Sequence, residues 1–370
     1  MHTNVHVIHY LEAPRLRVVA AWRPTSEVKN PGKCFAAHAG TLPYRQSFVS
    51  LPRGWTRTAA EGTIQSRFPT NELSMTTPIQ FAYDRAFSRN IGWVTLAEQQ
   101  VLKKARIAIA GLGGVGGAHL LTLCRLGISN FTISDFDEFD VHNINRQAGA
   151  FMPFMGQSKL ATMARLARDI NPEADIRLFP KGVQPDNVDD FLRDFDVYVD
   201  GLDFFALPAR RMVFAKCREK GIPVLTAAPL GVGTALLYFS PTGMSAEDYF
   251  KWEGHEVQEQ YARFIAGLSP SMMNRDYLVA PEAVNFQEKR GPSTIMACDL
   301  CAGVMGASVM KLLLKRGSIR AAPWGMHFDA YHQKLKFTWR PMGNSNPLQQ
   351  LLLMFIRPRL RGGPATDRVN

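Results

Sequence analysis

The sequence predicts an α/β fold with a doubly wound, mainly parallel sheet that is extended by antiparallel strands. Short apolar runs at 106–110, 131–134 and 196–200 alternate with longer amphipathic runs, a pattern typical of strands joined by crossover helices. A glycine-rich turn lies between the first apolar run and the helical run after it. Further along, 234–239 is strand-like but follows a short glycine turn instead of a helix, which indicates an antiparallel addition.

The glycine-rich turn is the most informative element. It reads Gly111-Leu112-Gly113-Gly114-Val115-Gly116, and a helix-like run from Gly117 to Leu126 follows it. Glycine allows the tight turn and lets the backbone approach a phosphate, while the start of a helix offers free N–H groups. The next strand ends in Asp135, whose carboxylate can accept hydrogen bonds from ribose hydroxyls. These elements predict a Rossmann-like nucleotide-binding unit; alone, they also fit an NAD- or FAD-binding domain.

The connection after this strand favours ATP over a dinucleotide. Residues 135–147 contain four acids, two asparagines and an arginine, more polar groups than a dehydrogenase needs there. A triphosphate with magnesium requires cationic groups for the phosphates and acids for the metal. Arg146 and Lys159 are the candidate phosphate contacts, and Ser158 is expected to cap a helix that runs to Ile170. We therefore predict ATP and Mg²⁺ as cofactors.

A further acid follows the buried strand at 196–200. It is Asp203, in the run Asp200-Gly201-Leu202-Asp203. Ligands of open α/β sheets bind at the carboxyl ends of the strands, so Asp203 is expected to meet a magnesium ion or a phosphate. Alternatively, Asp203 caps the helix expected at 207–220.

The rest of the sequence predicts the remaining strands of the sheet and one insertion between them. Apolar runs at 176–179 and 223–226 predict two further parallel strands, and 327–339 predicts a hairpin. Residues 244–292 are rich in polar and aromatic side chains, and we expect them to form an insertion that covers the substrate side. The expected folded domain is 79–342.

The net charge of +11 is concentrated at the two ends of the chain. Residues 1–80 carry nine Lys and Arg against four Glu, and 357–370 carry four Arg against one Asp. Segment 1–78 has little periodicity, so we expect it to be disordered or an extension foreign to the native protein, with Met75 as an alternative start. Segment 343–370 is expected to be a basic tail. The absence of an eighteen-residue apolar run and the five scattered cysteines favour a cytoplasmic protein without a membrane span.

Taken together, these motifs resemble those of the ubiquitin-like-protein activating enzymes, in particular the adenylyltransferases of the ThiF/MoeB type. The similarity covers roughly residues 83–240 and continues more weakly to about 340. Its motifs are Tyr83-Asp84-Arg85, Gly111 to Gly116, Asp135-Phe136-Asp137, Asn143-Ile144-Asn145-Arg146-Gln147, Gly156-Gln157-Ser158-Lys159 and Asp200-Gly201-Leu202-Asp203. Several motifs in the same order at compatible spacing are far more specific than any one of them.

The resemblance implies a reaction and a role for each residue. A carboxylate, typically the C-terminal glycine of a small ubiquitin-fold or sulfur-carrier protein, would attack the α-phosphate of ATP and form an acyl-adenylate. The implied nucleotide-binding residues are Gly111, Gly113, Gly114, Gly116, Asp135, Asp137 and Asn143. The implied catalytic residues are Arg146, Lys159, Asp203 as the Mg²⁺ ligand, and Arg85, which would reach into a partner subunit of a homodimer. Alternatively, Arg85 only pairs with Asp84 or Glu98 on its own helix.

This chain departs from the family pattern at two places. Phe204 replaces the asparagine that usually follows the magnesium-binding aspartate. Many members hold a structural zinc with two C-x-x-C pairs, whereas this chain has one pair, Cys298 and Cys301, so structural zinc is not expected. The pair opens a helix expected at 302–315, and we expect two buried cysteines on that packed helix; a redox pair is the alternative. No cysteine lies between Cys217 and Cys298, where thioester-forming members keep their nucleophile, so the reaction is expected to stop at the adenylate.

Two other functions remain open at this point. One is an enzyme of the threonylcarbamoyladenosine tRNA dehydratase type, a relative within the same family that would take tRNA as its partner. The other is an NAD-dependent oxidoreductase, to which the glycine turn alone would point.

Overall fold

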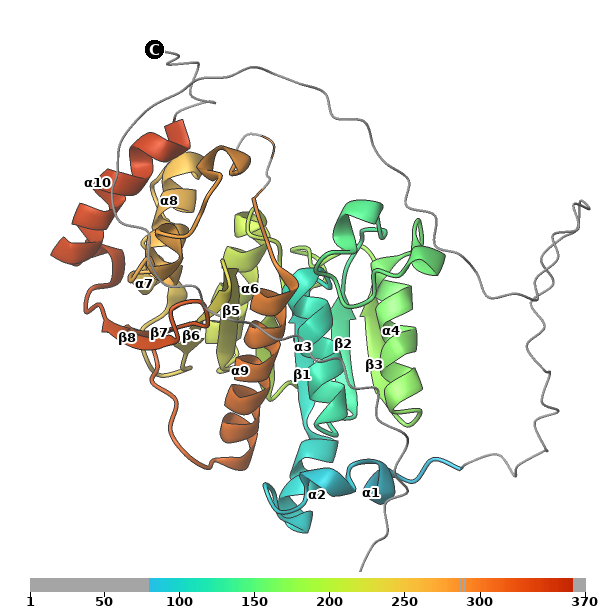
Figure 1. The fold of residues 1–370 in the computed structure, drawn as a ribbon. Helices are drawn as coiled ribbons and strands as arrows, with labels where there is room; N and C mark the ends of the chain where they lie inside the picture. The colour runs from blue at the N-terminus through green and yellow to red at the C-terminus, as the bar shows by residue number, and fades with distance from the viewer. Residues whose placement is uncertain (1–79, 286–287, 289–290, 362–370) are drawn as a thin grey trace, which may run out of the picture. The chain divides into compact units, whose positions relative to one another are not determined.

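The computed structural model describes residues 80–285, 288 and 291–361; the expected disordered or foreign segment 1–78 lies outside them. At its centre is one eight-stranded sheet with the order β3-β2-β1-β4-β5-β6-β7-β8 (Figure 1). The parallel strands are β1 (Arg106–Ala110), β2 (Asn130–Ser134), β3 (Asp175–Phe179), β4 (Val197–Asp200) and β5 (Val224–Leu230). The antiparallel strands are β6 (Gly233–Phe239), β7 (Trp324–Asp329) and β8 (Lys334–Trp339). The predicted fold class is confirmed.

Helices cover both faces of the sheet because the parallel strands are apolar on both sides. Ile107 and Ile109 of β1 lie in one core, which contains side chains of α3 (Gly114–Arg125), α4 (Lys159–Ile170) and α9 (Ile295–Leu314). Ala108 and Ala110 lie in a second core with α5 (Val188–Phe191), α6 (Leu207–Glu219), α7 (Ala246–Phe250) and α8 (Val257–Leu268). The alternation along one strand thus produces three layers.

The other helices lie at the ends of the described chain or within its connections. The α-helices among them are α1 (Tyr83–Ala86), α2 (Leu96–Lys104) and α10 (Pro347–Arg361). The short 3₁₀ helices are η1 (Ser88–Asn90), η2 (Val141–Asn143), η3 (Met152–Phe154), η4 (Met273–Arg275), η5 (Pro281–Ala283) and η6 (Gly343–Ser345).

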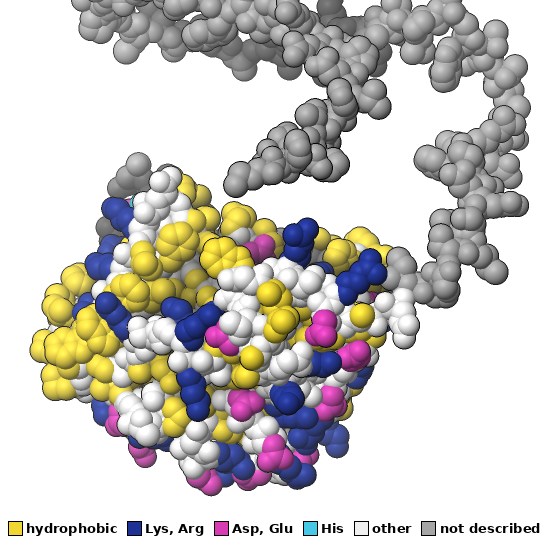
Figure 2. Space-filling model, turned by 90° about the horizontal axis from the view of Figure 1, so that it is seen from below, with side chains coloured by type: hydrophobic (Ala, Val, Ile, Leu, Met, Phe, Trp, Pro, Cys, Tyr) yellow, Lys and Arg dark blue, Asp and Glu magenta, His cyan; other side chains and the backbone are white. Residues whose placement is uncertain are grey.

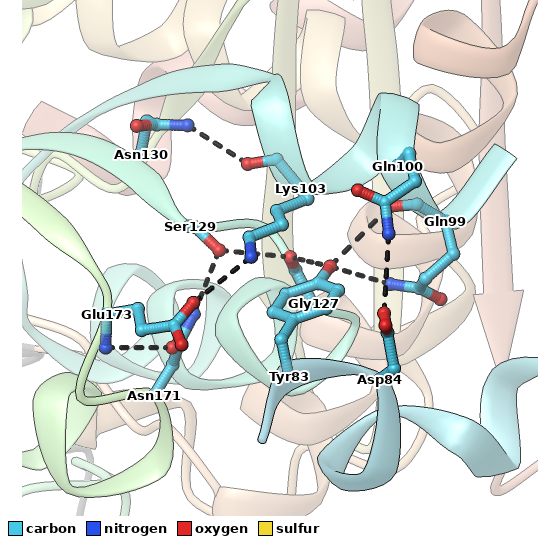
Figure 3. Close-up of polar contacts among 10 residues, drawn as sticks. All are labelled: Tyr83, Asp84, Gln99, Gln100, Lys103, Gly127, Ser129, Asn130, Asn171 and Glu173. Atoms are coloured by element: carbon cyan, nitrogen blue, oxygen red, sulfur yellow. Dashed lines mark hydrogen bonds and ion pairs between the residues drawn. The ribbon is translucent and has the colours of Figure 1, made fainter. Parts of the chain in front are cut away.

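The N-terminal helices are anchored at the amino ends of the parallel strands by Tyr83 (Figure 3). Its hydroxyl donates to the carbonyl oxygen of Gly127 at 2.5 Å and accepts from Nε2 of Gln99 at 3.0 Å. The ammonium of Lys103 lies 4.2 Å from the centre of the Tyr83 ring and pairs with Glu173 at 3.1 Å. These contacts fix α1 to α2 and to the loops that follow α3 and α4.

Helix α9 is longer than the helix expected at 302–315. It spans Ile295–Leu314 because the Thr294 hydroxyl caps it, accepting a hydrogen bond from the Ala297 N–H at 3.3 Å. By length and composition it is the one helix in the described part of the chain that could cross a membrane. Here it packs against α3 and against β5 and β6, as the core helix of a folded domain does.

The C-terminal segment also differs from its expectation as a basic tail at 343–370. Pro347–Arg361 form α10, which packs on α8. Arg357 donates to both carboxylate oxygens of Glu259, at 2.7 and 2.8 Å, and Leu353 is fully buried. This segment is helical because its apolar side chains pack on α8. The folded domain therefore extends beyond residue 342.

Strand β8 forms an exposed edge of the sheet. Hydrophobic side chains gather at the left of Figure 2, the side on which β8 lies in Figure 1. On β8 itself Leu335, Phe337 and Trp339 are 58%, 40% and 54% exposed. Lys334 and Lys336 alternate with them along the strand, and charged side chains on an edge strand disfavour uncontrolled pairing with another sheet.

Candidate active site

A cavity of about 2690 Å³ opens at the carboxyl ends of the parallel strands. Most of the site residues predicted from the sequence line it: Gly111, Gly113 and Gly114 after β1, Asp135 and Asp137 after β2, Arg146 and Lys159 from the connection to α4, and Asp203 after β4. Separate connections of the chain thus meet in one place, which is where ligands bind in open α/β sheets.

Close backbone contacts shape the glycine turn. Gly111 has a φ of +82°, a conformation that L side chains rarely adopt. A Cβ on Gly116 would overlap the carbonyl oxygen of Gly111, so this glycine allows the helix to pack on the turn, and it is not among the described residues that line the cavity. Because α3 begins at Gly114, its N-terminus brings the positive end of a helix dipole to the cavity.

Asp135 is tied to the glycine turn by its carboxylate. The carboxylate accepts hydrogen bonds from the backbone N–H groups of Leu112 at 2.6 Å and Asp137 at 2.8 Å. Burial raises the pKa of Asp135, and the two N–H donors oppose that shift. The carboxylate therefore has a fixed place beside the turn, as an acid that binds a ribose requires.

Lys159 and Asp137 form an ion pair at the edge of the cavity. Nζ of Lys159 lies 3.1 Å from the Asp137 carboxylate, and the side chains are 8% and 55% exposed. The backbone N–H of Lys159 also donates to the carbonyl oxygen of Asp137 at 2.9 Å, and Ser158 caps α4 as predicted. The ammonium is thus held in position, with a carboxylate partner that remains open to solvent and ligand.

Arg146 and Gln147 line the cavity from the connection between β2 and α4, whereas Asn143 is not among the described lining residues. The Arg146 guanidinium donates to the carbonyl oxygen of His142 at 3.0 Å. Gln147 is 8% exposed, and its Oε1 has no hydrogen-bond partner among the described residues. The side-chain oxygen of Asn143 accepts from the Asp140 N–H at 3.0 Å, so Asn143 shapes the turn at η2.

Asp203 lies in a turn and does not cap a helix. Its carboxylate accepts the Phe205 N–H at 2.9 Å, while α6 begins at Leu207 without a side-chain cap. The side chain is exposed and lines the cavity. The alternative in which Asp203 caps the following helix is therefore wrong.

A buried ion pair holds the turn that carries Asp203. Nε of Arg210 donates to Asp200 at 2.8 Å, and the two side chains are 3% and 2% exposed. Nη2 of Arg210 donates to the carbonyl oxygens of Leu202 at 2.6 Å and Asp203 at 3.2 Å. The Thr226 hydroxyl donates to the same Asp200 oxygen at 2.8 Å. Strand β4, strand β5 and helix α6 thus fix the backbone on which Asp203 sits.

A comparison with protein families agrees with this geometry. The ThiF family matches residues 87–350, which is most of the chain. The chain belongs to the ThiF family. The resemblance found in the sequence is thereby confirmed, and the matched range contains all the predicted site residues except Arg85.

Two kinds of curated protein are among the relatives of this ThiF-family chain. It is 32% identical over 151 residues to the tRNA threonylcarbamoyladenosine dehydratase of Haemophilus influenzae, an alignment that covers 40% of this chain and 55% of that protein. It is 38% identical over 112 residues to the probable adenylyltransferase/sulfurtransferase MoeZ of Mycobacterium tuberculosis, covering 29% of this chain and 28% of MoeZ. The chain thus spans about half the length of the first relative and less of the second.

Solved structures share the fold of this family member. The crystal structure of PaaA has a TM-score of 0.55 and 18% identity, covering 71% of this chain and 85% of PaaA. Escherichia coli MccB with AMPCPP and MccA has a TM-score of 0.53 and 17% identity, covering 72% of this chain and 74% of MccB. At these identities the likeness concerns the fold alone.

Arg85 lies away from the cavity of this ThiF-family fold. It is exposed on α1 and is not among the described residues that line the cavity. Because α2 leads directly into β1, α1 and α2 lie at the amino ends of the strands, whereas the cavity lies at the carboxyl ends (Figure 1). Glu98, one ion-pair partner considered for it, pairs with Arg316 at 3.2 Å, and Asp84 accepts from Gln100 at 3.3 Å.

The two cysteines of the C-x-x-C pair are buried, as expected. Cys298 borders the glycine turn, where a Cβ on Gly114 would lie 3.0 Å from its Sγ. Sγ of Cys301 shares a hydrogen bond with the Thr234 hydroxyl at 3.1 Å. Burial raises the pKa of both thiols. Both are therefore protonated and weakly nucleophilic at neutral pH.

Sequence reasoning assigned no role to two residues that the structure brings to the site, Arg210 and Gln147. A signal for Arg210 was present, because it shares one face of α6 with Leu207, Phe214 and Cys217, all buried. An arginine among apolar residues at helical spacing requires a buried partner. For Gln147 the sequence offers only its position next to Arg146 in the motif. That position does not predict that its side-chain oxygen has no hydrogen-bond partner in the described part of the chain.

Proposed function

We propose that this chain is an ATP-dependent adenylyltransferase that activates a carboxylate as an acyl-adenylate. The observation that carries the proposal is the meeting of the glycine turn, Asp135, Lys159 and Asp203 on one cavity. Glycines at a helix N-terminus suit phosphates, and an acid after β2 suits a ribose. A fixed lysine and an exposed aspartate suit a triphosphate with its metal. A dehydrogenase needs no such second set of charges.

In the proposed reaction a carboxylate oxygen of the substrate attacks the α-phosphorus of ATP. The bond between that phosphorus and the bridging oxygen breaks, and pyrophosphate leaves with the bonding electrons. Lys159 and Arg146 line the cavity and would offset the charge that develops on the phosphates, and the N-terminus of α3 would add its dipole. Asp135 fixes the ribose and thereby the position of the α-phosphate.

Asp203 would hold the magnesium ion that the resemblance implies. Mg²⁺ commonly takes only one or two protein carboxylates, while phosphates and water supply its other ligands. A single exposed carboxylate at the cavity fits that pattern. When bound, the ion neutralises phosphate charge and orients the leaving pyrophosphate.

We propose the C-terminal glycine of a small ubiquitin-fold or sulfur-carrier protein as the source of the carboxylate, and the adenylate as the end of the reaction. The sequence has no cysteine between Cys217 and Cys298. Burial raises the pKa of the Cys298 thiol, which borders the glycine turn, so this thiol is a poor acceptor for the acyl group.

We also propose a homodimer in which Arg85 of one chain acts at the cavity of the other. A five-residue strand spans about 17 Å, which separates α1 from the cavity of the same chain. The contacts of Tyr83 hold α1 in that position. An exposed guanidinium fixed there can serve a phosphate site only across a subunit interface.

A second candidate is an enzyme of the tRNA threonylcarbamoyladenosine dehydratase type. The 32% identity to the Haemophilus influenzae protein of that name over 151 residues favours it. The charge distribution favours the protein substrate instead, because most of the basic excess lies at the chain ends, in 1–80 and 357–370. Binding to an RNA backbone depends on such charge and weakens steeply with salt.

Pyrophosphate exchange separates these candidates. The full chain is incubated with ATP, Mg²⁺ and labelled pyrophosphate, together with either ubiquitin-fold proteins ending in diglycine or tRNA. Label entering ATP only with a protein partner supports the proposal. Exchange that requires tRNA and disappears at high salt supports the second candidate. Tight NAD binding without ATP binding would contradict both and favour an oxidoreductase.

A further inference from the structure

Beyond the nucleotide-binding end, the cavity has an apolar wall made by two helices. Its residues are Phe264 and Leu268 of α8 and Leu352, Phe355 and Ile356 of α10. They line the same cavity as the glycine turn and Asp203. None of the five carries a charge or a side-chain hydrogen-bonding group.

The apolar wall begins next to the turn that carries Asp203. The ring centre of Phe204 lies 5.3 Å from that of Phe264 and 5.8 Å from that of Tyr261, on the same helix. The Tyr261 hydroxyl donates to the carbonyl oxygen of Phe205 at 3.2 Å, and the Arg210 guanidinium lies 4.6 Å from the Phe264 ring centre. A carboxylate that reacts near Asp203 therefore has α8 as its neighbour.

Helix α10 is firmly attached and is largely additional to the shared fold. The family match ends at residue 350, whereas α10 continues to Arg361. Besides the ion pair of Arg357 with Glu259, Nε2 of Gln349 donates to the carbonyl oxygen of Ala266 at 2.9 Å. All of the described residues that α10 adds to the cavity therefore lie beyond the family match.

The size of the cavity leaves room for more than a nucleotide. Ligand pockets commonly measure about 300–1,000 Å³, against about 2690 Å³ here. The charged groups at the glycine-turn end account for ATP, and the remaining space includes the apolar wall. Apolar side chains stabilise a ligand by removing its apolar surface from water, and they offer nothing to phosphates.

We propose that the apolar wall is a specificity subsite for bulky apolar side chains that precede the C-terminal diglycine of a peptide or protein substrate. The inference rests on the proposed adenylation and names the substrate class. The terminal carboxylate lies near Asp203, and the residues that precede the terminal glycines lie along Leu352 and Phe355, the members of the wall that are not buried. The replacement of the usual asparagine by Phe204 extends the same apolar surface to the reacting end.

Short peptides with a free carboxylate test the subsite directly. Binding of acetyl-Leu-Phe-Gly-Gly and acetyl-Asp-Asn-Gly-Gly to the full chain is measured by calorimetry in the presence of AMPCPP and Mg²⁺. We expect the apolar peptide to bind at least about tenfold more tightly, because one or two buried apolar side chains account for such a difference. Unfractionated tRNA is measured in parallel.

Two adjacent residues of α10 provide matched variants. Phe355 lines the cavity and is 54% exposed, whereas Met354 is 65% exposed and is not among the described lining residues. Phe355→Ala should weaken binding of the apolar peptide by about threefold to tenfold and reduce the preference between the peptides. Met354→Ala should leave both affinities unchanged. Thermal unfolding of each variant checks that α10 remains folded.

Several results would overturn the subsite. These are equal affinity for both peptides, no binding of either peptide by a chain that binds AMPCPP, equal effects of the two variants, or tRNA binding in preference to both peptides. Loss of AMPCPP binding in the unmodified chain would contradict the proposed function instead. The nucleotide titration thus separates failure of the subsite from failure of the adenylation.

Discussion

Removing the arginine of the buried pair between Asp200 and Arg210 should both destabilise the fold and loosen the turn that carries Asp203. Arg210→Met keeps the aliphatic stem but leaves the Asp200 carboxylate buried, with Thr226 as its remaining side-chain donor. Breaking one partner of a buried ion pair costs about 3–5 kcal/mol of unfolding free energy. Both side chains are at most 3% exposed, so solvent offers little compensation.

The neighbouring residue supplies the control for this experiment. Arg211 pairs with Glu247 at 3.3 Å, and those side chains are 32% and 39% exposed. An exposed ion pair contributes about 0–1 kcal/mol, so Arg211→Met should change the unfolding free energy by no more than that. Urea unfolding of the full chain, followed by circular dichroism, compares the two variants. If Arg210→Met and Arg211→Met unfold at the same urea concentration, the reasoning about the buried pair is refuted.

A double variant separates the lost charge from the lost packing. Asp200→Leu combined with Arg210→Met removes both charges, and replacing a buried ion pair by apolar groups is often nearly neutral. We therefore expect the double variant to be more stable than Arg210→Met alone. Its pyrophosphate exchange should nevertheless stay low, because no donor then holds the carbonyl oxygens of Leu202 and Asp203.

The other predictions concern chemistry at the site. Asp203→Ala should lower pyrophosphate exchange by about 2–3 orders of magnitude with little change in melting temperature; a variant that unfolds yet turns over normally per folded molecule would assign Asp203 a structural role. Arg85→Ala and Asp203→Ala chains should each be inactive, and mixing them should restore one site per heterodimer; no recovery after proven subunit exchange would count against action across the interface. Calorimetry should detect ATP binding and no tight NAD binding. Iodoacetamide at neutral pH should leave Cys298 and Cys301 unmodified in the native chain, because burial raises both pKa values; rapid labelling seen by mass spectrometry would contradict this.

Local signals predicted the parallel half of the fold and much of the site. The glycine turn, the cap at Ser158 and the acid after β2 each depend on a few consecutive residues, and the structure has them where the sequence places them. The helix at Gly114 begins earlier than expected, because glycines conceal a helix start in a sequence pattern. The sequence therefore predicts well those features whose residues all lie within a single connection between two elements.

Features that depend on distant partners were not predictable in this way. The arginines of 357–361 favour a basic tail in the sequence, whereas α8, the helix on which Leu353 packs, lies far away along the chain. The partner of Arg210 lies on another element, and only the fold shows that Asp200 faces it. The position of Arg85 at the opposite end of the sheet likewise follows from the order of α2 and β1 in space.

Phe204 is a residue for which both the sequence pattern and the packing in the fold are informative. In the sequence it is a departure that removes a polar side chain beside the proposed metal ligand. In the structure its ring packs on Phe264 and Tyr261, so the turn that carries Asp203 is joined to α8 and, through α8, to α10. A polar residue there would place an amide against aromatic rings, at a cost in desolvation. The departure therefore fits a site in which the turn that carries the proposed metal ligand also forms the start of the apolar wall.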